Sequence, residues 1–466
     1  MKKRLILLLL VALQLVGLAY PQPFRVGGAK ILPGGSILAW GEIPENNTVL
    51  PIIAIIDTAG RVRDALCLTV SNARLIVLDA LEDDGRIVAG GIVVREGQRE
   101  AFAARFNGGT VDWAFSLQQG VYFVKALTKL SNEYVLFGLT SGASDSDIAV
   151  VFVDEKATIR RALRFGCPMY DDFVEKAFTR NQSLLIVGST WCQNVSYVDA
   201  LLVNMTAGLL QSITVGGAAH DEGLAAKVLD GKMVVVGSSF TSPGGLSDAY
   251  LAILNGTDLK VLTVGWQSYD GFIDVCGSLT NLYLLGYATM DVKTNGILIR
   301  LTEGAVASAL LVECDESIVP LAIGYEGDRL VAVFKATSAL VLVTFDHDLK
   351  PLTAFTVGES SFTTLRVRSI RDVKKNVHNV SDRWRIQRLQ LSLEPINVSL
   401  NPLNLEVNRL SLVSRPLRIE VGEYVEEIPL SKSLIRAIEQ NIPLIIILVP
   451  LLAILLVVII TARRPR

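Results

Sequence analysis

Acidic residues stand at the start of strands that recur along the middle of the chain. They come in four groups at intervals near fifty residues: Asp171 and Asp172, Asp221 and Glu222, Asp270, and Asp315 and Glu316. Because hard cations bind several oxygen ligands at once, these residues are a candidate binding arc for Ca²⁺ or a cationic ligand. The alternative is structural, with each carboxylate accepting hydrogen bonds from backbone N–H groups of a neighbouring element.

Motifs that carry catalysis are missing from the rest of the chain. There are only three histidines, and no HExxH, GxSxG, Walker or CxxC pattern occurs. His220, in GGAAHDEG, is the best placed for acid–base chemistry, but one histidine beside carboxylates is typical of a polar loop. Asp145 and Asp147, in SGASDSD, are a weaker cation-binding candidate and fit a hairpin loop better. We therefore expect no catalytic residue and no cofactor.

The five cysteines permit disulfides and leave at least one thiol unpaired. Cys167 precedes the first strand of one hairpin and Cys192 follows its second strand. Antiparallel pairing brings these two ends to the same edge, which predicts a Cys167–Cys192 disulfide. Cys276 lies inside an apolar strand and is expected to be buried as a thiol, whereas the pairing of Cys67 and Cys314 stays open.

A repeat of about 49 residues positions these side chains. Second strands of successive hairpins end at a small residue or its equivalent, at Gly41, Gly90, Gly138, Gly188, Gly237, Gly286 and Phe334. After each landmark comes an apolar strand that ends in a polar turn, and then one more strand. This makes seven units of four short strands over 24–357, with no convincing helix between them.

A four-stranded antiparallel sheet cannot cover both of its faces alone, whereas sheets packed around an axis cover one another. The sequence therefore predicts an all-β fold, a seven-bladed β-propeller of four-stranded blades. With the first strand of each blade innermost, the acidic residues would line an arc around one mouth of the channel. Carboxylates on neighbouring blades are then too far apart to share one ion, so we expect a structural role and no metal.

The units resemble the divergent repeats of secreted bacterial and archaeal β-propeller proteins. Those repeats run roughly D-x-F-V-x-K-L, a turn with Gly, W, a strand, G-G and D. The nearest matches are REAFAARFNGGTVDWAFSLQQG (99–120) and SYVDALLVNMTAGLLQSITVGGAAHDEG (196–223). Only Trp113 keeps the tryptophan after the turn, and Gly-Gly pairs are sporadic. The resemblance implies a fold and no particular activity, because propellers host many unrelated functions.

The segment 358–430 alternates apolar and polar residues with period two, interrupted by Pro395, Pro402 and Pro416. These are strand signals with turn breakers, and they predict a β-rich stalk or a small β-sandwich after the propeller. The segment is also basic. A solvated strand face explains this charge, and contact with acidic envelope glycans or lipid head groups is the alternative.

Both ends of the chain carry targeting signals. Residues 1–19 predict a signal peptide, with an uncleaved anchor as the alternative. A juxtamembrane segment, 431–441, precedes an uncharged run of nineteen residues, 442–460, which is long enough for one transmembrane helix. The tail, 461–466, is basic and therefore expected to be cytoplasmic. The prediction is a single-pass protein of the cell membrane, with its N-terminal domain outside.

Seven Asn-x-Ser/Thr triplets support that topology, because all lie in the part expected outside. They are more numerous than this composition would give by chance, and we expect glycosylation among them. The triplets begin at Asn46, Asn181, Asn194, Asn204, Asn255, Asn379 and Asn397.

These features favour a membrane-anchored, glycosylated propeller that acts in binding, adhesion or envelope display over an enzyme. Its expected partners are the membrane and an extracellular glycan, protein or surface-layer component, without nucleic acid. The alternative is an ectoenzyme, a hydrolase or lyase with its site at the propeller mouth. A quinone-dependent dehydrogenase propeller is expected to have a tryptophan in nearly every blade. The chain has five tryptophans in all, which argues against this function. Frequent sequons and few glutamines would suit an archaeal source.

Overall fold

A computed structural model of the chain describes residues 23–424 with short gaps. The gaps are 46–47, 119, 142–144, 168, 193–197, 207–208, 241–245, 267, 291–292, 371–376, 380, 382–384, 390–393, 396–398, 403–404 and 410–413. The expected signal peptide, juxtamembrane segment, transmembrane helix and tail lie outside the described residues, as do Asn46, Asn194 and Asn397. Within the described part, no helix is long and apolar enough to cross a membrane.

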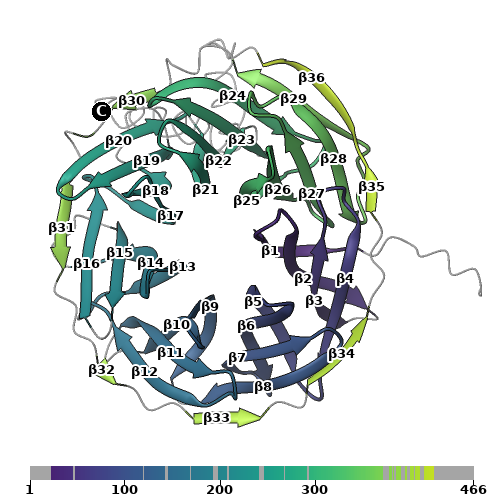
Figure 1. The fold of residues 1–466 in the computed structure, drawn as a ribbon, viewed down its shortest axis with the longest axis vertical. Helices are drawn as coiled ribbons and strands as arrows, with labels where there is room; N and C mark the ends of the chain where they lie inside the picture. Colours follow the sequence, from purple (N-terminus) through teal and green to yellow (C-terminus); the bar gives the residue numbers. More distant parts are fainter. Residues whose placement is uncertain are drawn as a thin grey trace, which may run out of the picture. The chain divides into compact units, whose positions relative to one another are not determined.

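Seven four-stranded antiparallel sheets stand around a central axis, which confirms the predicted seven-bladed propeller (Figure 1). Blades 1 to 3 comprise β1 (Arg25–Ile31), β2 (Ile37–Glu45), β3 (Thr48–Ile56), β4 (Val62–Val70), β5 (Arg74–Asp83), β6 (Arg86–Arg95), β7 (Gln98–Asn107), β8 (Thr110–Gln118), β9 (Val121–Leu130), β10 (Glu133–Ser141), β11 (Ser146–Asp154) and β12 (Ile159–Phe165). Blades 4 and 5 comprise β13 (Asp172–Arg180), β14 (Ser183–Thr190), β15 (Asp199–Thr206), β16 (Leu209–Gly216), β17 (Asp221–Leu229), β18 (Lys232–Ser239), β19 (Asp248–Asn255) and β20 (Asp258–Val264). Blades 6 and 7 comprise β21 (Tyr269–Ser278), β22 (Asn281–Met290), β23 (Lys293–Thr302), β24 (Ala305–Glu313), β25 (Val319–Glu326), β26 (Arg329–Lys335), β27 (Ala339–Phe345) and β28 (Pro351–Gly358).

The hydrophobic core lies between the blades, because each sheet is apolar on both faces. Strand β3 shows how one strand serves both neighbours: Ile52 and Ala54 pack toward blade 7, and Ile53 packs toward blade 2. All three side chains are fully buried. Alternate residues of one strand thus enter two different clusters, which explains why the strands read as continuous apolar runs.

The repeated glycine marks a close approach inside a blade. In blade 4, Gly188 pairs with Val174 next to a bulge in the inner strand. A Cβ atom at Gly188 would lie 1.8 Å from the carbonyl oxygen of Phe173, so a larger residue cannot fit without backbone movement. In blade 2 the residue that makes this contact is Gly91, because a Cβ atom there would meet the carbonyl oxygen of Ile76. The landmark in blade 2 is therefore Gly91 and not the predicted Gly90.

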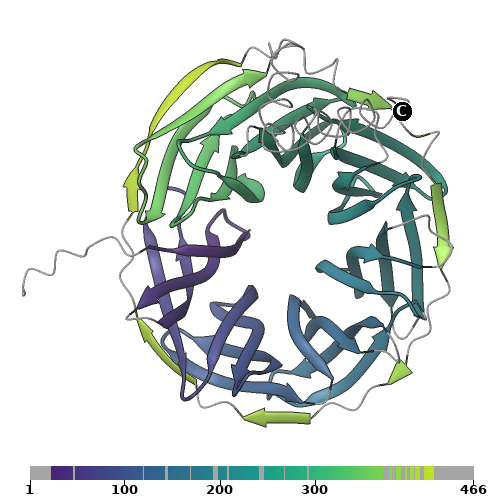
Figure 2. The ribbon, with the colours of Figure 1, turned by 180° about the vertical axis from the view of Figure 1, so that it is seen from behind.

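The segment after blade 7 forms a belt of eight short strands around the outside of the ring (Figures 1 and 2). Starting at blade 6, successive belt strands add to the outer edges of blades 6, 5, 4, 3, 2, 1 and 7, and the last returns to blade 6. The belt strands are β29 (Thr364–Ile370), β30 (Val377–Asn379), β31 (Arg385–Leu389), β32 (Glu394–Pro395), β33 (Ser399–Pro402), β34 (Leu405–Arg409), β35 (Ser414–Pro416) and β36 (Arg418–Tyr424).

This arrangement corrects the expected stalk or small β-sandwich at 358–430. In the described part of that segment, β29 to β35 each pair antiparallel with the fourth strand of a blade. The physical reason is that the fourth strand of every blade presents an unpaired edge, and an adjacent polar–apolar strand satisfies it. The described part of the segment therefore belongs to the propeller.

The belt also joins the first and last blades. Strand β34 pairs with β4 of blade 1, and β35 pairs with β28 of blade 7, so the chain crosses the seam between them. On the inner side of the seam, the backbone N–H of Phe24 donates to the carbonyl of Ser338 at 2.7 Å, and the Phe24 side chain is fully buried. The four strands of blade 1 are consecutive in sequence, and so are the four strands of blade 7. The belt therefore closes the ring, and in the described part of the chain no blade combines strands from the two ends of the propeller sequence.

Candidate functional site

The ring has two faces that differ in their loops. Because the strands of a blade alternate in direction, the linkers between blades and the loops between second and third strands lie on one face, here called the linker face. The turns between first and second and between third and fourth strands lie on the opposite face, here called the turn face. The first strand of each blade is nearest the axis, as expected (Figure 1).

Three residues of the predicted acidic arc close the linkers between blades. Asp172, Asp221 and Asp270 stand at the start of inner strands and are fully buried. A carboxylate oxygen of each accepts a hydrogen bond from a backbone N–H in the preceding linker, from Cys167 at 2.5 Å, Gly217 at 2.7 Å and Trp266 at 2.8 Å respectively. Each carboxylate thus ties the linker that follows one blade to the inner strand of the next blade.

A second carboxylate stands at each of these linkers, at the start of the third strand. These residues are Asp147, Asp199 and Asp248. A Cβ atom on the linker glycine, Gly166, Gly216 or Gly265, would lie about 2 Å from a carboxylate oxygen of the respective residue. Sequence reasoning treated Asp147 as a weak cation-binding candidate that fits a hairpin loop better, and it missed Asp199 and Asp248. Their signal is the Gly at the end of the outer strand, or directly after it, in blades 3, 4 and 5.

Burial raises the pKa of Asp172 to about 7. Hydrogen bonds from Thr190 and from the Cys167 N–H oppose this rise, whereas the charges of Asp147 and Asp145 add to it. A buried carboxyl group next to other carboxylates holds its proton more strongly, because a second negative charge would be poorly solvated there. Asp172 is therefore a group that can change protonation near neutral pH.

The remaining arc residues have separate partners. Asp171 accepts the N–H of Ser146 at 2.8 Å. Asp315 pairs with Arg366 of the belt at 3.1 Å, and Glu316 accepts the N–H of Thr337. Among the described residues, no group of three or more His, Cys, Asp or Glu side chains is arranged to hold a metal ion.

Glu222 has two side-chain partners on the linker face. Its Oε1 lies 2.8 Å from Nε2 of His220, and its Oε2 accepts a hydrogen bond from the Ser238 hydroxyl at 3.4 Å. The His220 ring also makes an edge contact with Phe240, at 5.5 Å between centroids. A serine nucleophile needs the histidine as its direct base, whereas here the carboxylate lies between them. The geometry suits ligand binding better than acyl transfer.

Exposed apolar side chains gather on the linker face. In the described part of the chain, six of the nine large exposed apolar residues lie in linkers, in second-to-third loops or at the first two positions of inner strands, in blades 3 to 6. They form what we call the apolar arc: Tyr122, Met169, Trp191, Phe240, Leu246 and Tyr269. Leu209 and Leu352 lie at the turn face, and Val421 lies in the belt. Exposed apolar groups concentrated on one face are typical of an interaction surface.

A disulfide fixes part of this arc. Cys167 in the linker before blade 4 is joined to Cys192, which follows the second strand of that blade, with Cα atoms 5.5 Å apart. Trp191, half exposed, precedes Cys192 and is therefore held close to the linker. The other three cysteines are buried. Burial raises the pKa of Cys276 to about 12 and that of Cys314 to about 11, so both thiols stay protonated.

Charged residues on the inner strands form a second feature, here called the charged ring. Its members are Lys30, Asp79, Lys125, Glu175, Lys176, Lys227 and Asp274, and each blade from 1 to 6 contributes at least one. Three ion pairs join neighbouring blades: Lys30 with Asp79 at 2.7 Å, Lys125 with Glu175 at 3.0 Å and Lys227 with Asp274 at 3.2 Å. Sequence reasoning missed this ring. Its signal is a charged residue near the middle of almost every inner strand.

Lys176 links blades that are not adjacent. Its ammonium group donates a hydrogen bond to the carbonyl of Ile273 in blade 6, at 2.9 Å. Burial lowers the pKa of Lys176, the charge of Asp274 opposes that effect, and Lys227 adds to it. The charged ring therefore ties blade 4 to blade 6 across the centre, and its tight internal pairing points to a structural role.

No family model matches the chain, and no curated protein matches it. Among solved structures, the crystal structure of the tricorn protease is similar, with 10% sequence identity and a TM-score of 0.26 over 79% of this chain. The chain spans 44% of the length of that protein. A likeness this weak supports no conclusion about activity, and the resemblance to secreted repeat proteins stays one of fold.

Proposed function

We propose that the chain is a cell-surface, membrane-anchored and glycosylated β-propeller that binds an extracellular partner through its linker face. The observation that carries the proposal is the apolar arc, which concentrates Tyr122, Trp191, Phe240 and Tyr269 on one face of four consecutive blades. Aromatic side chains supply much contact area with little loss of conformational freedom, and they are enriched where binding energy is concentrated. Anchoring and glycosylation rest on the 442–460 run and the sequons.

The partner expected from this chemistry is a glycan or a protein of the cell envelope. Flat aromatic rings can pack against sugar rings, and Glu222 and His220 supply hydrogen-bonding groups beside Phe240. The same groups would serve a protein partner, since its interface also needs apolar anchors with polar groups around them. Adhesion or envelope display would follow from either partner.

The test is a binding screen of the purified protein against a glycan array and a panel of envelope proteins. Trp191→Ala, Phe240→Ala and Tyr269→Ala should each weaken the strongest interaction by about tenfold or more. Leu209→Ala and Leu352→Ala are matched controls, because they remove exposed apolar side chains from the turn face. Equal losses in both sets, or no loss in the first, would refute the linker face as the binding surface.

An ectoenzyme, a hydrolase or lyase acting at the propeller mouth, is the second candidate. The observation in its favour is the His220–Glu222 pair, which places an imidazole and a carboxylate 2.8 Å apart on the exposed linker face. A screen of glycoside, ester and polysaccharide substrates would test it. Turnover that disappears in His220→Ala, with the melting temperature unchanged, would favour the enzyme over the binding protein.

A further inference from the structure

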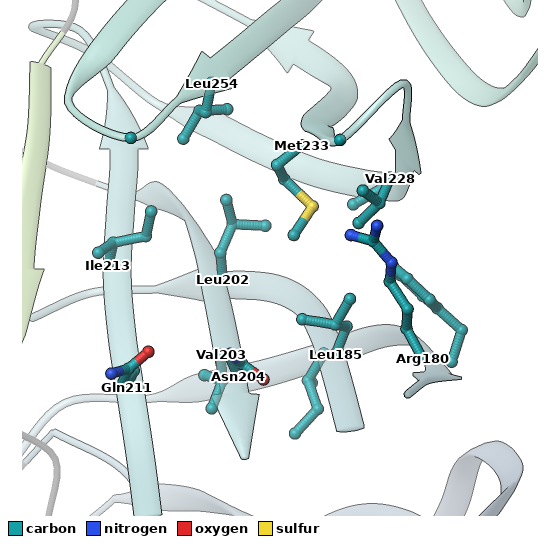
Figure 3. A pocket seen from close by; sticks show the side chains of 15 residues that line it. Arg180, Leu185, Leu202, Val203, Asn204, Gln211, Ile213, Val228, Met233 and Leu254 are labelled. Carbon is teal, nitrogen blue, oxygen red and sulfur yellow. The ribbon is translucent and has the colours of Figure 1, made fainter. Parts of the chain in front are cut away.

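A cavity of about 280 Å³ lies between blades 4 and 5, and it is lined at the turn face rather than the linker face (Figure 3). Its walls come from β13 to β19 and from the turns that follow β17 and β19. Leu185, Leu202, Met233 and Leu254 line its interior, so most of its wall is apolar. The small Ala226 on β17 leaves room where a larger side chain would fill the space.

One cationic side chain lines this cavity. Arg180, the last residue of β13, is exposed, and Figure 3 shows its guanidinium beside Val228. Among the described residues, the lining contains no Asp, Glu or Lys, and no carboxylate pairs with Arg180. Its five N–H donors are thus directed to solvent or to a ligand, in the planar fork that matches an oxyanion.

A polar group deeper in the wall also lacks a partner. The Oδ1 atom of Asn204 is buried, and no hydrogen bond to it is made within the described residues. A buried amide oxygen without a partner is unfavourable. Its carbonyl and NH₂ ends exchange by a simple rotation, so the amide can meet either a hydroxyl or an oxyanion. The cavity therefore combines an apolar interior with two groups that recognise a polar head.

We infer that this cavity binds an amphiphile that has one apolar chain and a terminal oxyanion, either a carboxylate or a phosphate monoester. The chain would displace water from the space around Leu202, Met233 and Leu254, and the head would pair with Arg180. The volume is at the small end for ligand sites, which fits one medium-length chain and excludes a two-chain lipid. The site is independent of the linker face.

The experiment measures binding of dodecanoate and dodecyl phosphate to the purified full-length protein by calorimetry and by thermal shift. Dodecanol and dodecylammonium are the neutral and cationic comparisons. Dodecanoate or dodecyl phosphate should bind with one molecule per protein chain and raise the melting temperature, because it is a ligand of the native state. The carboxylate and phosphate arms distinguish a free fatty acid from a phosphorylated amphiphile. Equal binding of dodecylammonium, or no binding of either oxyanion, would overturn the inference.

Two variants localise the site. Arg180→Gln should weaken oxyanion binding about tenfold or more and leave dodecanol unaffected. Ala226→Phe should abolish binding of every probe by filling the cavity, and its own melting temperature reports whether it folds. Arg329→Gln is the matched control, because Arg329 is an exposed arginine at the turn face of blade 7. Binding that is unchanged in Arg180→Gln, or lost equally in Arg329→Gln, would refute recognition by Arg180.

Discussion

Asp79 in blade 2 and Asp274 in blade 6 make the same contacts, four blades apart. Each accepts a lysine ammonium from the preceding blade, Lys30 or Lys227, and a backbone N–H from the following blade, Leu127 or Ile323. Each also accepts the N–H of its own next residue. One carboxylate thus holds three blades together at the centre of the ring. The same arrangement occurs in blade 2 and in blade 6, on either side of blade 4.

Asp274 should therefore contribute strongly to stability. Burial acts to raise its pKa, but Lys227, Lys176 and the two N–H groups overcome that effect, and the pKa is lowered overall. A lowered pKa stabilises the fold at pH values above the unfolded value of 3.8, and this contribution is lost as the pH falls through the folded pKa. Asp274→Asn should reduce stability by about 1–3 kcal/mol at neutral pH.

Thermal melting of wild type and Asp274→Asn between pH 7 and pH 3 measures this contribution. The difference in stability between the two proteins should shrink below about pH 4, as the wild-type carboxylate becomes protonated. Asp328→Asn, which changes an exposed carboxylate in a turn of blade 7, is the control and should be neutral. A constant difference at every pH would mean that the charge of Asp274 contributes nothing.

Asp172 should show the opposite pH dependence. Its folded pKa of about 7 lies above the ordinary 3.8, so the folded chain binds a proton more tightly than the unfolded chain. Its contribution to stability is therefore present below about pH 4 and is lost as the pH rises through about 7, by roughly 1.4 kcal/mol per unit of pKa difference. Asp172→Asn mimics the protonated form and should flatten the stability profile between pH 4 and pH 7. A variant that follows the wild-type slope would show that Asp172 does not titrate there.

Calcium should leave the melting temperature unchanged, because the carboxylate of Asp221 already binds the Gly217 N–H. Asp221→Asn should lower stability by about 1–3 kcal/mol whether or not Ca²⁺ is present. Differential scanning fluorimetry with Ca²⁺ and with a chelator checks both statements. A calcium-dependent rise that disappears in Asp221→Asn would instead establish a cation site at the arc.

The sequence was enough to predict the blades, because the strands and turns of each repeat can be recognised within that repeat. Six of the seven landmarks are Gly, and the bulge beside each explains why: at Gly188 a side chain would meet the Phe173 carbonyl. The charged ring was missed although a charged residue recurs near the middle of almost every inner strand. The partner of Asp79 is about fifty residues away, and the repeat alone does not show which of these charges meet.

The belt was wrongly predicted as a stalk for a similar reason. Period-two alternation identifies a strand but does not say which edge it pairs with. Pro395, Pro402 and Pro416 each end a belt strand, and proline in sheets is confined to edges and strand ends. In hindsight these prolines favoured short edge strands over an independent sandwich, whose central strands need every N–H group.

The disulfide should stabilise blade 4 without deciding whether the ring folds. It closes a loop of 25 residues, for which the chain-entropy relation gives about 3.5 kcal/mol. Non-reducing peptide mapping of the purified protein should find Cys167 linked to Cys192. The double variant Cys167→Ser/Cys192→Ser should stay folded with a lower melting temperature and should bind its linker-face partner more weakly, because Trp191 is released. Two free thiols at these positions in the purified protein would contradict this.

Closure of the ring by the belt gives the most demanding prediction. Blades 1 to 7 have consecutive strands, so without β29 to β36 only side chains and a few hydrogen bonds such as Phe24 to Ser338 hold the seam. A chain that ends at residue 360 would also expose the edges of seven outer strands. It should melt roughly 10 °C or more below a chain that ends at residue 424 and should associate in size-exclusion chromatography. If the shorter chain melts at the same temperature and stays monomeric, the inter-blade core alone closes the ring and the belt is only an appendage to it.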